Sequence, residues 1–174
     1  MKLSDDDFTL FGLPQRHALD RSDLDARRRQ LQGEVHPDRF ASEGAAAQRV
    51  AMQWAVRVNE AYQHLKDPLL RGAALCQLRG VPIDAERNTA MPAAFLMQQM
   101  AWREALDEAA DPTQVQALDE AVSLEERTML AALTDLLDQQ QNTAAAAAQV
   151  RALMFVARFR QAINRRLDLL DAYP

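Results

Sequence analysis

The sequence contains few of the residues from which sheets, disulfides and membrane spans are built. Its 174 residues include 1 Cys and 5 Gly. Runs of Val, Ile or Thr are missing while Ala is abundant, and this composition favours helices over strands. No stretch of about 18 consecutive apolar residues is present that could span a membrane, and the acidic N-terminus lacks the apolar run of a secretory signal. We therefore expect a soluble, all-α protein of the cytoplasm.

The single cysteine and the acidic charge exclude further classes of function. Cys76 alone cannot form an internal disulfide framework or a multi-thiolate metal site. It lies in the apolar helical segment GAALCQL, so we expect a small core residue. The net charge of −5 argues against nucleic acid as the main partner, because phosphate binding requires a cationic surface.

The first half of the chain begins with the signals of a helix over residues 19–35. Ser22 precedes Asp25 by three residues, which is the pattern of a capping box at a helix start. Pro37 disfavours helical backbone angles at His36, so the helix should end there.

A second helix is predicted over residues 43–66, with Ser42 as its cap, and a shorter helix over residues 69–79 follows it. The first two helices are joined by a loop and form an antiparallel hairpin. The second helix carries an apolar stripe at helical spacing, formed by Val50, Trp54, Val58, Ala61 and Leu65.

The composition changes over residues 80–92, where Gly80, Pro82 and Pro92 occur without helical periodicity. We interpret this segment as a domain junction. The proline residues favour a stiff junction.

The second half predicts an up-down-up bundle of three helices with short connections. The first covers residues 93–110. The second covers residues 113–141, begins at the cap Asp111-Pro112, and could break at a second capping-box pattern over residues 123–126. The segment QNTAAAAAQ carries the next turn, and the last helix runs to about residue 171.

The triplet His36-Pro37-Asp38 allows three interpretations: a proton relay, a pair of metal ligands, or a rigid knob presented to another protein. A relay requires a nucleophile within reach in a water-excluding pocket, and no G-x-S-x-G motif is present. His17 and His64 share no metal-binding spacing with His36. The plainest alternative is a helix-ending turn without further function.

The residues around the triplet resemble the J-domain of DnaJ-type co-chaperones. The segment EVHPDRF is followed by VNEAYQHLKDPLLR, and the string matches that family at the expected distance. Arg39 stands where many members carry lysine, and the positive charge is kept. The matching residues after the triplet are Asn59, Glu60, Ala61, Tyr62, Leu65, Asp67, Pro68 and Arg71.

The resemblance narrows to the HscB family and covers nearly the whole chain. It rests on DDFTLFGLP at the start, on the length, and on FLMQQMAWREALDE after the junction. Eukaryotic relatives carry an extra cysteine-rich N-terminal segment, which this sequence lacks, so a bacterial cytoplasmic form is implied. The resemblance also implies an activator of an HscA-type ATPase chaperone that is not itself an enzyme and needs no metal or other cofactor.

The resemblance assigns ATPase docking to His36, Pro37 and Asp38 and to the positive face of the preceding helix. Pro37 leaves the corner little conformational entropy to lose on binding. The carboxylate of Asp38 can accept charge-assisted hydrogen bonds from an arginine of the partner, and nearby cations can steer the encounter. The alternative for these cations is a solvated helix face. They are Arg27, Arg28, Arg29 and Arg39.

Helical periodicity predicts a recognition patch on the helix over residues 93–110. At about 100° per residue, the side chains of Phe95, Trp102, Leu106 and Ala109 form the core face, whereas a second set points nearly the opposite way. Large apolar side chains bordered by carboxylates suggest recognition, and methionines adapt their shape to a partner. The alternative is a helix buried on two sides. The second set is Leu96, Met97, Met100, Glu104 and Glu108.

The HscB resemblance assigns binding of an IscU-type iron–sulfur scaffold to the same five residues and to Phe155 on the last helix. Ala101 stands where related sequences can carry an acidic residue, so one polar contact is lost and the patch is more apolar. Eight acidic residues against one arginine, Arg127, lie between Glu104 and Arg127. This side of the bundle should repel anionic partners and suit a basic one.

The sequence therefore predicts an all-α protein without nucleic-acid or membrane partners, and the resemblance implies an L-shaped co-chaperone. As the resemblance implies, it would stimulate an HscA-type ATPase and deliver an IscU-type scaffold to it, which assists cluster transfer and the maturation of iron–sulfur proteins. Two alternatives remain: a general J-protein adaptor with another client, and a small metal-dependent hydrolase that uses His36 and Asp38. The predicted parts are a J-domain over residues 1–79, a junction over 80–92 and a scaffold-binding three-helix bundle over 93–174.

Overall fold

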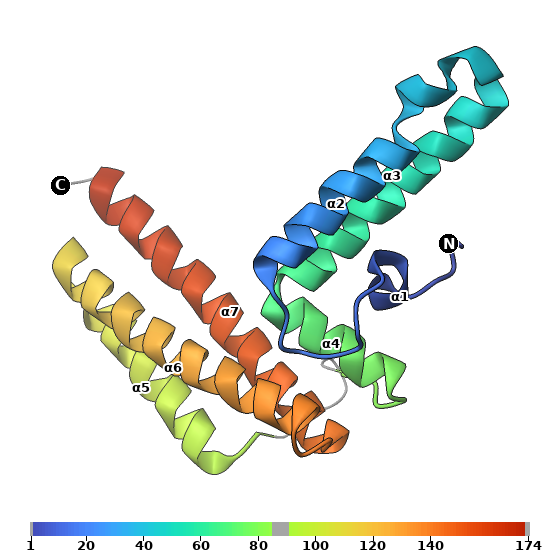
Figure 1. Cartoon of the computed structure of the whole chain (residues 1–174). Coiled ribbons are helices and arrows are strands. Elements are labelled where there is room, and N and C mark those ends of the chain that lie inside the picture. Colours follow the sequence, from blue (N-terminus) through green and yellow to red (C-terminus); the bar gives the residue numbers. More distant parts are fainter. Residues whose placement is uncertain (1, 85–90, 173–174) are drawn as a thin grey trace. The chain divides into compact units, whose positions relative to one another are not determined.

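The computed structural model describes residues 2–84 and 91–172, and within these ranges every regular element is a helix. The chain divides into two compact units, residues 1–75 and 76–174, and the division falls within α4 (Pro68–Leu78). Part of the predicted junction, residues 85–90, lies outside the described residues. The all-α fold class is confirmed (Figure 1).

The first unit is a helical hairpin of α2 (Arg21–Val35) and α3 (Ala45–Lys66), against which the short α1 (Asp7–Phe11) packs (Figure 1). Its core is made of large apolar side chains without exposed surface, and burial of each contributes about 1.5–3 kcal/mol relative to exposure. These side chains include Phe8, Leu24, Val58, Leu65 and Leu75.

The start of α2 differs from the predicted capping box. Asp20 is the cap: its carboxylate accepts hydrogen bonds from the backbone N–H groups of Ser22 at 2.7 Å and Asp23 at 3.4 Å. The Ser22 hydroxyl donates to the same carboxylate at 2.7 Å. Hydrogen bonds from the side chain and backbone of Ser22 lower the pKa of the Asp20 carboxyl below its ordinary value. The prediction of Ser22 as cap was wrong because a nearby carboxylate is the stronger acceptor.

The segment between α2 and α3 is a 3₁₀-helix, η1 (Pro37–Glu43), where the sequence predicted a loop. Pro37 occupies its first position, which tolerates proline because no N–H is needed there. Ser42 lies inside η1, and α3 starts after Gly44, which has φ 91° and makes no side-chain cap. The predicted cap Ser42 was therefore wrong.

The predicted apolar stripe of α3 is buried only in its second part. Val58, Ala61 and Leu65 have no exposed surface, but Val50 is 51% exposed. Because α2 ends at Val35, the first turns of α3 face the short η1 instead of a full helix. There Val50 and Trp54 line an open groove of about 440 Å³ together with apolar side chains of α2 and η1.

Most residues that carry the J-domain resemblance after the triplet hold the first unit together. The Tyr62 hydroxyl donates to Asp25 at 2.8 Å, and this hydrogen bond is the main cause of a lowered pKa of the Asp25 carboxyl. Asp67 caps α4 by accepting from the backbone N–H of Leu69 at 2.8 Å. Arg71 donates to the carbonyl oxygens of His17 and Leu65.

The second unit contains the predicted three-helix bundle: α5 (Ala93–Glu108), α6 (Pro112–Asp138) and α7 (Thr143–Ala172) (Figure 1). Asp111 caps α6 as predicted and accepts a hydrogen bond from the backbone N–H of Gln114 at 2.9 Å. The helix continues through residues 123–126 without a break. Val122 and Met129 are buried on either side of this segment, so one apolar stripe packs into the bundle along the whole helix.

The turn before α7 is shorter than predicted, because the alanine run belongs to the helix. The Asn142 side chain accepts a hydrogen bond from the backbone N–H of Ala145 at 3.2 Å, and Ala146 and Ala147 are buried. Cys76 is buried as predicted, and burial raises the pKa of its thiol. Within residues 2–84 and 91–172, no helix has the length and apolarity to traverse a bilayer.

Candidate functional site

The His36-Pro37-Asp38 triplet forms a sharp corner between α2 and η1. His36 ends α2 with extended backbone angles, φ −64° and ψ 127°. The backbone N–H of Asp38 donates to Nδ1 of His36 at 3.3 Å, and Oδ2 of Asp38 lies 3.6 Å from the same nitrogen. Because Nδ1 accepts, a neutral imidazole carries its proton on Nε2. The imidazole is thus oriented by the corner itself.

Arg39 links this corner to the last turn of α2 by two hydrogen bonds. Its Nη1 donates to the carbonyl oxygen of Gly33 at 2.9 Å, and its backbone N–H donates to the carbonyl oxygen of His36 at 3.0 Å. The guanidinium therefore caps the last turn of α2, where a positive charge is favoured by the helix dipole. Together with the fixed φ of Pro37, these bonds hold the corner rigid before any partner binds.

The corner is open to solvent. The side chain of His36 is 57% exposed and that of Asp38 is 89% exposed. A general base works best in a site that excludes water and holds a nucleophile within hydrogen-bond reach, and this arrangement provides neither around His36. In the described part of the chain, no three His, Cys, Asp or Glu side chains converge in the manner of metal ligands. The geometry suits docking better than acid–base chemistry.

The predicted arginine run of α2 divides between internal and exposed positions. Arg27 donates to Asp23 at 3.0 Å and to the carbonyl oxygens of Phe11 at 2.9 Å and Gly12 at 2.7 Å. These bonds tie α1 to α2. Arg27 therefore has a structural role within the first unit, which the sequence had not indicated.

Arg28 also faces the interior of the unit. Its guanidinium lies over the ring of Tyr62, 4.1 Å from the centroid, at a distance where a cation–π contact stabilises the pair. Arg29, in contrast, is exposed, as is Arg39 beside the corner. Of the four predicted cations, these two remain accessible to a partner surface.

The predicted patch on α5 is exposed in the isolated chain. Leu96 is 46% exposed, Met97 71% and Met100 70%, and Glu104 and Glu108 are exposed beside them. We call these five residues the α5 patch. Single exposed apolar residues are common, but a contiguous set bordered by carboxylates is typical of a binding surface.

The opposite face of α5 packs into the bundle as predicted. Trp102 and Leu106 are 6% and 9% exposed, and Ala109 just beyond the helix is 4% exposed. The ring of Trp102 stacks on Phe159 of α7, with centroids 5.8 Å apart and an interplanar angle of 16°. Phe95, also predicted for the core face, is half-buried. Since Trp102 and Leu106 anchor the helix, the α5 patch faces away from the core.

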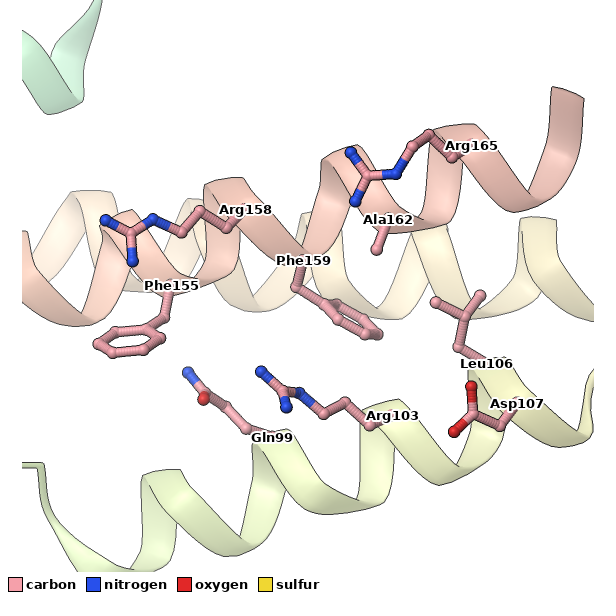
Figure 2. Close-up of a pocket in the computed structure, with 9 residues that line it drawn as sticks. All are labelled: Gln99, Arg103, Leu106, Asp107, Phe155, Arg158, Phe159, Ala162 and Arg165. Carbon is pink, nitrogen blue, oxygen red and sulfur yellow. The ribbon is translucent and has the colours of Figure 1, made fainter.

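Phe155 of α7 is half-buried beside the side of α5 that carries Gln99 and Arg103 (Figure 2). These residues line a groove of about 460 Å³ between the two helices. The guanidinium of Arg158 lies 5.7 Å from the centroid of the Phe155 ring. Phe155 was expected here from the family resemblance, whereas the arginines of this groove were not predicted. The only available signal was the seven-residue spacing of Arg158 and Arg165 on the last helix.

Comparisons with known proteins agree in pointing to one family. A family model described as the HSCB C-terminal oligomerisation domain matches residues 91–164. The co-chaperone protein HscB homolog of Burkholderia mallei (strain SAVP1) is 51% identical over 174 residues, covering 98% of this chain and 99% of that protein. The solved chaperone HscB from Vibrio cholerae is 38% identical with a TM-score of 0.80, over 95% of this chain and 99% of that one.

The human co-chaperone HscB superposes with a TM-score of 0.89 at 23% identity, over 95% of this chain and 84% of that one. At this identity the likeness concerns the fold alone. The bacterial matches carry the assignment, because their identity is higher and they span nearly both chains.

Proposed function

The chain belongs to the HscB family of co-chaperones, and we propose that it stimulates an HscA-type ATPase chaperone and delivers an IscU-type iron–sulfur scaffold to it. The observation that carries this proposal is the presence of two exposed surfaces in two separate units, both suited to docking. The first unit presents the corner at His36-Pro37-Asp38, and the second presents the α5 patch. An adaptor between two partners requires two such surfaces.

In the proposed activation step, the corner binds the ATPase and takes no part in breaking bonds. The Asp38 carboxylate, which is 89% exposed, accepts charge-assisted hydrogen bonds from a cationic side chain of the partner. Arg29 and Arg39 favour approach to an acidic surface. Because Arg39 and Pro37 already hold the corner, little conformational entropy is lost on docking. The chain itself is proposed to have no enzymatic activity.

In the proposed delivery step, the α5 patch and Phe155 hold the scaffold. Burial of Leu96, Met97 and Met100 supplies the apolar contact, while Glu104 and Glu108 select a partner with basic residues at the rim. One chain that binds both partners raises the concentration of the scaffold near the ATPase. An iron–sulfur cluster would be cargo of the scaffold, and this chain would need no cofactor of its own.

The bacterial cytoplasm is the compartment that the family resemblance implies, and we include it in the proposal. The domain assignment is included as well: a J-domain over residues 1–79 for the ATPase, and the bundle over 93–174 for the scaffold.

The decisive experiment measures the steady-state ATPase rate of an HscA-type chaperone alone, with this protein, and with this protein plus IscU-type scaffold. We expect stimulation by this protein and a further increase with the scaffold. His36→Gln should return the rate to the basal level while scaffold binding and circular dichroism stay unchanged, because the side chain is exposed and makes few contacts.

His64→Gln is the matched control. This histidine is also exposed, at 52%, and its Nδ1 lies 2.9 Å from Asp7, a contact that a glutamine amide can replace. It should stimulate the ATPase like the wild type. Full stimulation by His36→Gln would disprove the role of the corner. A preference for unfolded polypeptide over the scaffold would instead favour a general J-protein adaptor.

A further inference from the structure

The groove between α5 and α7 has a cationic lining. Arg103 reaches in from α5, Arg158 and Arg165 extend from α7, and the rings of Phe155 and Phe159 project from α7 into the space between the helices (Figure 2). Asp107 is the one acidic residue of the lining. Three guanidinium groups and one carboxylate leave an excess of positive charge.

The arginines of α7 fall into two groups that differ in their partners. Arg160 binds Glu126 at 2.7 Å and Asp119 at 3.4 Å, and Arg166 donates to the carbonyl oxygen of Ala109 at 2.9 Å. These arginines hold the bundle together.

The groove arginines are not used in this way. Within the described residues, none of Arg103, Arg158 and Arg165 forms a hydrogen bond or ion pair, and the Arg158 guanidinium lies over the ring of Phe155. Asp107 forms no ion pair with any of these arginines in residues 2–84 and 91–172. The guanidinium groups are therefore available to an external acceptor.

The groove is continuous with the α5 patch. With Leu96 placed at zero on a helical wheel of about 100° per residue, Gln99 lies at about 300° and Arg103 at about 340°. Both lie between the buried face, around Trp102 and Leu106, and the exposed face that begins at Leu96. A protein seated on the α5 patch therefore reaches the groove without leaving this helix.

The dimensions of the groove fit an extended peptide. Its lining on α7 runs from Phe155 to Arg165, which is about 15 Å at a rise of about 1.5 Å per residue. An extended chain advances about 3.3 Å per residue, so the groove accommodates roughly four or five residues. The volume of about 460 Å³ lies in the usual range of ligand sites.

We propose that this groove binds a short acidic segment, with an apolar side chain among its carboxylates, of the protein held at the α5 patch. Only the identification of that protein rests on the proposed function. Carboxylates accept paired hydrogen bonds from the planar guanidinium groups, and the apolar side chain packs on the Phe155 and Phe159 rings. The α5 patch, with its carboxylates, and the cationic groove then recognise opposite charges side by side, which fixes the orientation of the partner.

The test uses fluorescence anisotropy with a labelled pentapeptide of four glutamates around a central phenylalanine, and with its four-lysine counterpart. The acidic peptide should bind the full-length chain, more weakly as salt is raised, and binding of the lysine peptide should not depend on the groove arginines. Arg103→Gln combined with Arg165→Gln should weaken binding of the acidic peptide at least about tenfold, because two charge-assisted contacts are removed. These side chains are exposed, so the fold is retained.

Arg127→Gln is the control for loss of a positive charge elsewhere, since it removes one guanidinium from an exposed position of α6 outside the groove. It should change binding by less than about twofold. Equal binding by the groove variant and the wild type would overturn the proposal. Displacement of the peptide by inorganic phosphate at equal charge concentration would also overturn it, in favour of a site for free anions.

The scaffold itself separates this proposal from the proposed function. If the groove variant binds an IscU-type scaffold more weakly than the wild type does, the inference is supported. If only a variant of the α5 patch binds the scaffold more weakly, the inference is overturned and the proposed function stands. If the acidic peptide binds the groove but the scaffold ignores changes in the α5 patch, the proposed function fails instead.

Discussion

Replacing both methionines of the α5 patch by alanine should weaken scaffold binding without changing the stability of the chain. In the free protein Met97 is 71% exposed and Met100 70% exposed. Truncation therefore removes little packing within the bundle, and exposed substitutions of this kind change the free energy of unfolding by about 0.5 kcal/mol or less. The same exposed surface is available for burial against a partner.

The expected loss of affinity follows from that surface. Full burial of a methionine side chain contributes about 1.5–3 kcal/mol. With about 70% of each side chain still exposed, burial against the scaffold contributes roughly 1–2 kcal/mol per residue. The double variant should thus lose about 2–4 kcal/mol, or about 30-fold to about 700-fold in Kd. We expect the lower end, because ordering each flexible side chain costs about 0.5–1.5 kcal/mol.

Isothermal titration of an IscU-type scaffold into the wild type and the double variant measures this loss. Leu124→Ala is the matched control, since Leu124 is an apolar side chain of α6 with 59% exposure outside the α5 patch. It should leave Kd unchanged. Stimulation of the ATPase without scaffold should be the same in all three proteins. Affinities within about twofold for wild type and double variant would show that burial of these methionines does not contribute to recognition.

The remaining predictions concern the first unit, and urea unfolding measures both. Arg27→Ala should lower the free energy of unfolding by about 1–3 kcal/mol, because its bonds to Asp23 and two backbone carbonyls are lost. The exposed Arg29→Ala should leave stability unchanged and only slow association with the ATPase at low salt. Equal stability losses for the two variants would contradict the assignment of Arg27 to the fold and Arg29 to the surface. Gly12→Ala should lower the free energy of unfolding by about 1–2 kcal/mol, because Gly12 has φ 61° and an added Cβ would lie 3.0 Å from Nη1 of Arg27. Gly33→Ala should instead raise it by about 0.5–1 kcal/mol, because Gly33 is helical and an added Cβ would meet no atom within 4 Å. A Gly12→Ala variant as stable as the wild type would refute the strain argued for Gly12.

The sequence predicted features that depend on one helix at a time. The cap at Asp111 and the end of α2 at His36 follow from residues next to each other in the chain, and both are present. The orientation of α5 follows from the helical repeat alone, which is why Trp102 is buried and Met97 exposed as expected. Where two local signals competed, the prediction was wrong: Asp20 and Ser22 both fit a cap, and only Asp20 serves as one.

The exposure of Val50 could not be predicted from its stripe. Its spacing is the same as that of the buried Val58, but α2 ends before it can cover the first turns of α3. Periodicity states which side chains share a face, and it does not state how far a neighbouring helix extends over that face.

The sequence by itself determined the longer helices α2 to α7, the end of α2 before Pro37 and the two faces of α5, because backbone preferences and the 3.6-residue repeat act over a few neighbouring residues. It did not indicate the short helices α1 and η1. Only the tertiary structure decided which arginines are free. Arg27 donates to carbonyl groups of α1 and its cap, whereas Arg103 and Arg165, distant in the chain, both line one groove and form no hydrogen bond or ion pair within the described residues. Whether a guanidinium is paired depends on which atoms another helix brings within hydrogen-bond distance, and that distance is set by packing.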